Sequence, residues 1–284
     1  MAAVRAIAWR AFADARVRTI SFALLFALSA IIQATAYREG YPTLEDRRDF
    51  ARSIGQTDVA RLLYGAPHDL ITVGGYVSWR VGGSMAVFAA LFGLLGAVRA
   101  MRAEEDAGRA ELLLAGTVSR RKAFLAQLAA IGVGAAVLWL ALFVAFLAGR
   151  LPAGGSAYLA LAIVSVVPVF AGVGAIASQL APNKRMATGL ATGVLVIAFA
   201  LRTVAAQPSA GVDWLRWATP LGWAEELRPF ADPQPLVLLL PAVAGALLLA
   251  AAACCEVAPG ADNIPVDAIA TSSRNTESTG AEAL

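Results

Sequence analysis

The sequence predicts an all-α integral membrane protein with six transmembrane helices. Three observations predict this class. The chain of 284 residues is 59% hydrophobic and only 15% charged, with a mean hydropathy of +0.68, whereas soluble domains carry about 25% charged residues. Its apolar residues form continuous runs instead of alternating with polar ones, which favours helices over a β-barrel. The runs contain no Asp or Glu.

Six apolar runs approach the roughly 20 residues that a helix needs to cross the hydrocarbon core. Together they define a transmembrane domain over residues 19–255. Arg80, Lys122 and Arg202 lie near the ends of runs, so we expect their side chains to reach the headgroups. The runs are Thr19–Ala36, Val81–Val98, Ala123–Ala148, Ser156–Leu180, Met186–Ala206 and Pro235–Cys255.

The first run has two interpretations. Ala34-Thr35-Ala36 could serve as a signal-peptidase site. However, the run is longer than an ordinary signal core, and the preceding residues 1–18 place Val4, Ile7 and Ala11 on one face of a helix. We therefore expect a retained anchor, preceded by a cytoplasmic helix that lies in the membrane interface before the chain turns into the membrane.

The distribution of basic residues predicts the orientation. Basic side chains concentrate before the first run, in the second connection and in the fourth, and short basic connections stay in the cytoplasm. We expect a bacterial inner (cytoplasmic) membrane protein with both termini cytoplasmic. The tail, residues 256–284, is polar without apolar periodicity, so we expect it to be disordered. The basic residues are Arg5, Arg10, Arg16 and Arg18, then Arg99, Arg102, Arg109, Arg120, Arg121 and Lys122, then Lys184 and Arg185.

Two connections have structure of their own. The predicted external loop, residues 38–75, has the pattern of an ordinary soluble helix around Phe50. Residues 211–234 are too polar to span the membrane and too aromatic for a free loop. We expect short re-entrant helices there that dip into the outer interface, broken by Pro220 and Pro229.

Small residues recur four positions apart, a spacing that allows helices to approach closely in lipid. The pattern fits packing inside the bundle or an interface between subunits. The pairs are Gly132 with Ala136, Gly174 with Ser178, and Gly189 with Gly193.

The sequence lacks the residues of several chemistries. A phosphate-binding loop ends in Lys-Ser or Lys-Thr, but Lys122 precedes Ala123 and Lys184 precedes Arg185. No run carries the acid or histidine of a proton relay; the single histidine, His68, falls in the predicted external loop. The net charge of +3 does not indicate a nucleic-acid partner. We expect no catalytic residues, metal or cofactor, so energy for transport must come from another polypeptide.

The second connection, residues 101–119, could receive that energy. Its acidic and apolar side chains share helical spacing, and Gly116 is suited to end the helix. A solvated loop remains an alternative, although an exposed triple Leu favours a docking surface. The candidate contact residues are Glu104, Glu105, Gly108, Arg109, Glu111 and Leu112.

The segment Arg102–Gly116 resembles the cytoplasmic signature of ABC-2 type permeases, particularly the first half of the actinobacterial exporters of polyketide antibiotics such as tetronasin. The resemblance extends from about Arg5 to Cys255. Further matching places are Leu63-Tyr64-Gly65, Ser178–Pro182 with Lys184 and Arg185, Pro220–Trp223 and Arg228–Phe230.

The resemblance implies one half of a type V (ABC-2) exporter, with residues 101–119 as the coupling helix. It implies two copies of a separate ATPase subunit that bind ATP and Mg²⁺, a second permease half, either identical or paralogous, and a hydrophobic or amphipathic substrate such as an antibiotic. A different class, a non-transporting scaffold or sensor that uses the external loop, fits the same topology. A passive channel is disfavoured because no run carries a polar stripe.

Overall fold

The computed structural model describes residues 2–54, 57–106, 120–207 and 211–257. In these ranges every regular element is a helix, and six helical segments are long and apolar enough to cross a membrane. The chain is therefore an all-α membrane protein, as the sequence predicts. The segments are Ala15–Gly40, Val73–Met101, Phe124–Ala148, Ala153–Leu180, Lys184–Ala205 and Pro235–Cys254.

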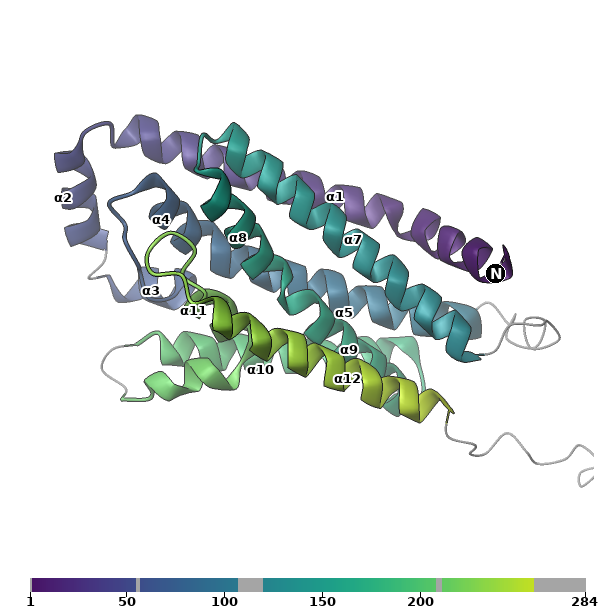
Figure 1. Cartoon of the computed structure of the whole chain (residues 1–284). Coiled ribbons are helices and arrows are strands. Elements are labelled where there is room, and N and C mark those ends of the chain that lie inside the picture. The colour runs from purple at the N-terminus through teal and green to yellow at the C-terminus, as the bar shows by residue number, and fades with distance from the viewer. Residues whose placement is uncertain (1, 55–56, 107–119, 208–210, 258–284) are drawn as a thin grey trace, which may run out of the picture.

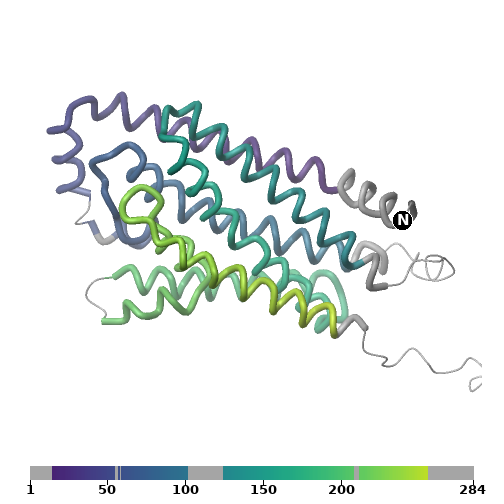
Figure 2. The backbone as a smooth tube through the Cα atoms, in the orientation of Figure 1, coloured from purple at the N-terminus to yellow at the C-terminus, as the bar shows by residue number. Residues whose placement is uncertain are grey.

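The long helices lie side by side in an elongated bundle (Figure 1). One end of the bundle, which we call the N-terminal end, holds the start of α1 (Ala2–Gly40), the end of α5 (Gly83–Asp106), the start of α7 (Arg120–Ala148) and the end of α12 (Leu239–Val257) (Figure 1). The tube in Figure 2 shows the same bundle from the same direction. The opposite end, which we call the α11 end, carries α11 (Pro220–Glu226).

The first span does not begin where the sequence suggests. Helix α1 is continuous from Ala2 to Gly40, with no break near Thr19. The expected turn between an interfacial helix over residues 1–18 and the first span is therefore absent from α1. The location of the helix start in the membrane interface stays a prediction.

The second span begins earlier than its apolar run. It consists of α4 (Val73–Val77), a π-helical turn η1 (Ser78–Gly82) and α5. Thr72 caps α4, because its side chain accepts a hydrogen bond from the backbone N–H of Gly75. The glycines and Arg80 in this stretch lower the hydropathy, which explains why the sequence predicted a start at Val81.

The fourth span is divided. Helix α8 (Ala153–Val164) is followed by α9 (Val166–Leu180) with Ser165 between them. Pro168 has no backbone N–H, and its ring opposes the carbonyl of residue 164, which accounts for the interruption. The fifth span, α10 (Lys184–Ala205), starts at Asn183, whose side chain accepts a hydrogen bond from the N–H of Met186 at 2.9 Å.

Helices α5 and α9 form the centre of the bundle. In an apolar 18-residue stretch of each span, 67% of the second span and 72% of the fourth is buried in the protein, compared with 22–33% in the other four. Two glycines allow their close approach. A Cβ atom at Gly93 would lie 2.5 Å from the carbonyl oxygen of Val167, and one at Gly174 would lie 2.6 Å from that of Leu94. The small pair at Gly174 and Ser178 therefore packs inside the bundle.

The other predicted small pairs face outward. A Cβ atom at Gly132, Gly189 or Gly193 would meet no other part of the protein within 4 Å. Packing inside the bundle is therefore wrong for these three glycines. Their surfaces are open to lipid or to a second subunit.

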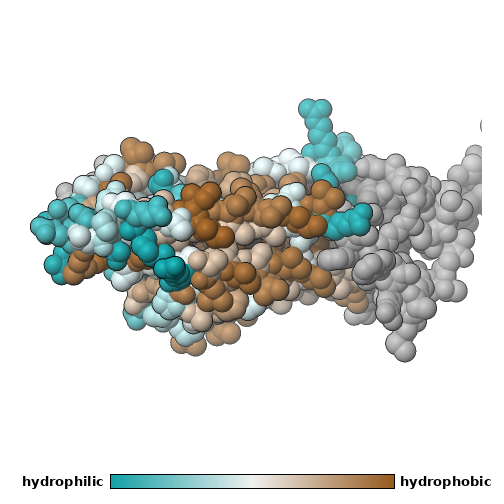
Figure 3. Space-filling model, turned by 90° about the horizontal axis from the view of Figure 1, so that it is seen from above, coloured by the Kyte–Doolittle hydropathy of each residue, from teal (hydrophilic) through white to brown (hydrophobic). Residues whose placement is uncertain are grey.

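The predicted external loop contains two helices, α2 (Leu44–Ile54) and α3 (Asp58–Tyr64). Aromatic rings hold α2 on the bundle. The rings of Tyr37 and Tyr76 stack with centroids 4.0 Å apart, and the ring of Phe50 meets both edge-on at 5.6 and 5.7 Å. Figure 3 shows that the visible surface is hydrophobic along the middle of the bundle and hydrophilic at the α11 end, where α2 also lies.

Candidate functional site at the α11 end

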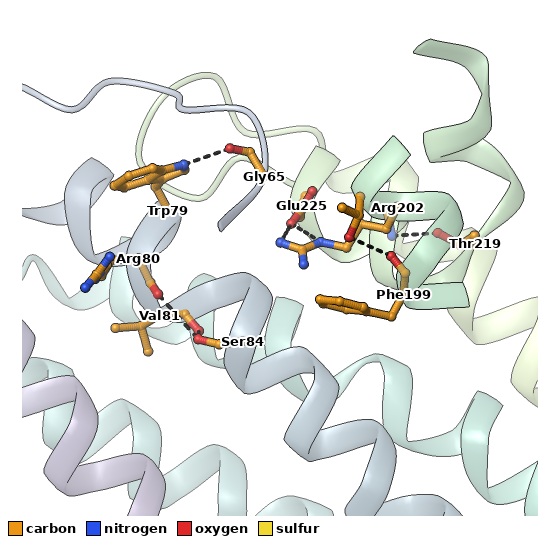
Figure 4. A network of polar contacts seen from close by, with 11 residues as sticks. Gly65, Trp79, Arg80, Val81, Ser84, Phe199, Arg202, Thr219 and Glu225 are labelled. Carbon is orange, nitrogen blue, oxygen red and sulfur yellow. Dashed lines mark hydrogen bonds and ion pairs between the residues drawn. The ribbon is translucent and has the colours of Figure 1, made fainter. Parts of the chain in front are cut away.

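The α11 end contains a buried arginine in the fifth span. The Arg202 side chain is only 2% exposed and pairs with the Glu225 carboxylate of α11, to which its Nε donates a hydrogen bond of 2.5 Å (Figure 4). The predicted extension of Arg202 to the headgroups is therefore wrong. An arginine near lipid is costly without a counter-charge, and a carboxylate inside the protein provides one.

Two glycines create the space for this ion pair. A Cβ atom at Gly83 would lie 2.2 Å from Nη2 of Arg202, and one at Gly65 would lie 2.7 Å from Oε1 of Glu225. Gly65 also has a φ of +85°, a conformation that favours glycine. Its carbonyl oxygen accepts a 2.9 Å hydrogen bond from Nε1 of Trp79, in the π-helical turn η1. The ion pair thus joins the second span, the fifth span and α11.

The neighbouring acid, Glu226, points into a second charged group. Its carboxylate accepts hydrogen bonds from Arg216 at 2.9 Å and Arg228 at 2.6 Å. Arg216 lies in the short helix η2 (Asp213–Ala218) and also pairs with Asp213 at 3.2 Å. These contacts attach η2 and the chain after α11 to α11 itself.

The helices of residues 211–234 match the prediction of short helical elements. Thr219 caps α11 by accepting a hydrogen bond from the N–H of Gly222, and Pro220 occupies the first turn. Pro220 therefore starts α11, a position where proline needs no N–H partner. The Phe230 ring packs against Gly74 and Gly155, where Cβ atoms would lie 2.5 and 2.2 Å from it. Location in the outer membrane interface stays a prediction.

A small cavity adjoins the ion pair. It measures about 30 Å³, which is room for only a few water molecules. Polar and apolar side chains line it together, including those of Tyr64, His68, Ser78, Leu159, Glu225 and Phe230. A cavity of this size cannot accept a drug-sized compound.

The surroundings shift the pKa of two groups at this end. Burial raises the pKa of the Glu225 carboxyl, and the charge of Arg202 opposes that change. Burial and the positive charges of Arg228 and Arg216 lower the pKa of the His68 imidazole, against the influence of Glu226. His68 is therefore neutral at neutral pH.

Two of the predicted docking residues lie at the opposite, N-terminal end. Glu104 and Glu105 belong to the last turns of α5. Gly108, Arg109, Glu111 and Leu112 lie outside the described residues, as does the predicted disordered tail from residue 258. The described residues contain no group of three or more His, Cys, Asp or Glu that could hold a metal ion.

Sequence reasoning missed the Arg202–Glu225 pair, although a signal was present. An arginine inside an apolar run needs an anionic partner, and Glu225 and Glu226 are adjacent acids in an aromatic segment. Three of the segments that resemble ABC-2 type permeases lie around this ion pair. Gly65 lies against Glu225, and Pro220–Trp223 forms the start of α11. In Arg228–Phe230, the Arg228 side chain donates a hydrogen bond to Glu226.

Comparisons with known proteins identify the family. Residues 55–255 match the family described as the C-terminal domain of the multidrug efflux system permease Rv1217c. The multidrug efflux system permease protein Rv1217c of Mycobacterium tuberculosis is 32% identical over 234 residues, which cover 81% of this chain and 42% of the relative. The chain thus spans less than half the length of that relative. The match to a C-terminal domain does not support the predicted resemblance to a first half. The chain belongs to the Rv1217c family of multidrug efflux permeases.

Proposed function

We propose that the chain is one permease half of an ATP-driven exporter that moves a hydrophobic or amphipathic compound out of the cell. The observation that carries this proposal is the match of residues 55–255 to a multidrug efflux permease. The six apolar spans provide the membrane domain. The resemblance to polyketide-antibiotic exporters supports an antibiotic-like compound as the substrate.

The energy source is a separate ATPase subunit, present in two copies, that binds ATP and Mg²⁺. The chain has no phosphate-binding loop of its own. The end of α5 and the start of α7, which flank residues 107–119, lie at the N-terminal end, far from α11 (Figure 1). We assign this end to the cytoplasm of a bacterial inner-membrane protein, so that the ATPase docks on residues 101–119, with Glu104, Glu105, Gly108, Arg109, Glu111 and Leu112 as contacts.

A second permease half completes the conduit. The outward-facing Gly189 and Gly193 on α10 support a subunit interface there, because glycines allow helix backbones to approach closely in lipid. The second half is a copy of this chain or a paralogue. The substrate then moves between the two halves.

Charge reversal in the connection tests the proposal. Glu105→Lys combined with Glu111→Lys should abolish co-purification with the ATPase and ATP-dependent efflux. The matched control reverses two exposed acids at the α11 end, Glu39→Lys with Glu45→Lys, and should retain both. Unchanged complex and efflux in the first variant would refute the docking assignment. A membrane preparation in which no ATPase accompanies the chain would favour the scaffold or sensor alternative.

A further inference from the structure

Arg18 occupies an unusual position at the N-terminal end. It belongs to the first span, Ala15–Gly40, yet its side chain turns toward α5. Its guanidinium carbon lies 5.1 Å from the centroid of the Phe92 ring. A Cβ atom at Gly96 would lie 3.1 Å from Nη2 of Arg18, so this glycine makes room for the guanidinium. The half-buried Arg18 therefore sits between α1 and α5.

A second arginine lies nearby. Arg99 follows Gly96 by one helical turn on α5, is exposed, and is close enough to act electrostatically on Arg18. Like charges repel, and the cost increases where water is scarce. Among the acids whose side chains the structure describes, none forms an ion pair with either guanidinium, and Nε of Arg18 is buried without a hydrogen-bond partner. The two arginines thus form a cationic pair with no anion among the side chains that the structure places.

The position in the membrane indicates the source of that anion. Residue Val17, next to Arg18, is 69% exposed, so lipid-accessible apolar surface adjoins the arginine. A guanidinium close to the end of a span reaches the level of the headgroups, where lipid phosphates are abundant. Arginine binds phosphate through paired, charge-assisted hydrogen bonds. An acid on a docked soluble subunit would have to enter the span beside Phe92 to do the same.

We propose that Arg18 and Arg99 bind the phosphate of an anionic phospholipid in the leaflet at the N-terminal end. The headgroup phosphate lies against the two guanidinium groups, and an acyl chain follows the apolar surface of α1. The lipid holds α1 against α5 at the end where the chain connects to residues 101–119. This assignment stands on the contacts of Arg18 and does not depend on the transported compound.

Lipid retention tests the proposal. The full chain, purified in detergent, is exposed to dioleoylphosphatidylglycerol or to dioleoylphosphatidylcholine, and bound lipid is counted by native mass spectrometry. Wild type should retain phosphatidylglycerol in preference to phosphatidylcholine. Arg18→Gln with Arg99→Gln should lower phosphatidylglycerol retention by about tenfold or more, as expected when charge-assisted hydrogen bonds are lost. The double lysine variant should retain an intermediate amount because it keeps both charges.

Control variants and a competing anion make the test decisive. Arg48→Gln with Arg52→Gln removes two exposed charges on α2 and should leave retention unchanged. Arg99→Gln alone changes an exposed side chain, so it keeps the fold and should still reduce retention. Equal retention in wild type, in Arg99→Gln and in Arg18→Gln with Arg99→Gln overturns the proposal. Equal binding of the two lipids, or displacement of phosphatidylglycerol by millimolar inorganic phosphate, overturns the assignment to a lipid.

Discussion

Arg202 of α10 and Glu225 of α11 are 23 residues apart in the sequence and form an ion pair in the protein interior. The arginine is almost completely buried, and the acid is 22% exposed. Neutralising one partner of a buried ion pair leaves the other charge buried without compensation. Replacing both partners with apolar residues removes both buried charges, so no desolvation cost remains. This relationship makes the following variants informative.

Neutralising the acid should destabilise the protein strongly. We expect Glu225→Gln to lower the free energy of unfolding by about 3 kcal/mol, because Arg202 then stays buried without a counter-charge. The double variant Arg202→Met with Glu225→Leu should lie within about 1 kcal/mol of wild type. Denaturant unfolding in detergent micelles measures both.

An exposed ion pair supplies the control for that experiment. Arg52 and Asp49 pair at 2.8 Å on α2, with side chains 74% and 62% exposed. Asp49→Asn should change the free energy of unfolding by less than about 1 kcal/mol, because solvent screens the pair. Equal losses in Glu225→Gln and Asp49→Asn would contradict a buried role for Glu225.

A methyl group at Gly83 should act against the same ion pair. In Gly83→Ala the new Cβ lies 2.2 Å from Nη2 of Arg202 and 2.8 Å from Oε1 of Glu225, so the paired side chains must shift. We expect a loss of about 1–3 kcal/mol in unfolding free energy, the usual cost of overpacking. Gly154→Ala in α8, where the Cβ meets nothing within 4 Å, should be neutral or stabilising by up to about 1 kcal/mol. The same unfolding assay compares the two, and the opposite order would refute the packing at Gly83.

The indole hydrogen bond of Trp79 gives a third prediction. Trp79→Phe removes the donor to the Gly65 carbonyl, which remains buried. An unsatisfied buried acceptor costs about 1–3 kcal/mol, so thermal unfolding should begin at a lower temperature. Trp214 is 65% exposed, and Trp214→Phe serves as the matched control with an unchanged transition. Similar shifts in both variants would show that the Gly65 contact contributes nothing.

Stability should also depend on pH through His68. Its pKa in the folded protein lies below the ordinary value of 6.5, so the unfolded chain binds a proton more readily. Its stabilising contribution is complete above pH 6.5 and is lost as the pH falls from there through the lower folded pKa. Arg228, Arg216 and Glu226 are the charged groups that act on it.

The measurement for His68 is a comparison of two pH profiles. Wild type and His68→Gln are unfolded at several values between about pH 5 and pH 8. The difference in their stability should change in the variant's favour as the pH falls, since only wild type can then gain the proton on unfolding. A difference that is constant across the range would show that His68 titrates normally.

Much of the fold follows from the sequence, because lipid requires long apolar segments. Each of the six predicted runs coincides with one observed span, and three of the runs extend one residue beyond it. The predicted helix around Phe50 is α2. The second span was not fully predicted because Arg80 lowers its hydropathy. The guanidinium carbon of this partly buried arginine lies 4.0 Å from the centroid of the Tyr64 ring. A hydropathy scale gives every arginine the same unfavourable value, whether or not a neighbouring group such as the Tyr64 ring interacts with its charge.

The candidate site was harder to predict for the same reason. Arg202 and Glu225 belong to different helices, and only the packing of α10, α11 and Gly83 brings them together. The docking residues Glu104 to Leu112 followed instead from spacing and resemblance, and their role stays a prediction.

Transport by the reconstituted complex tests the central claim most directly. The chain is placed in vesicles with its candidate ATPase, and the outward movement of a fluorescent hydrophobic dye is followed after ATP addition. We predict dye movement with the ATPase and ATP together, and none with the chain alone or with Glu105→Lys plus Glu111→Lys. ATP hydrolysis by the purified chain without a partner, or ATP-driven dye movement that does not need the ATPase, would contradict the account.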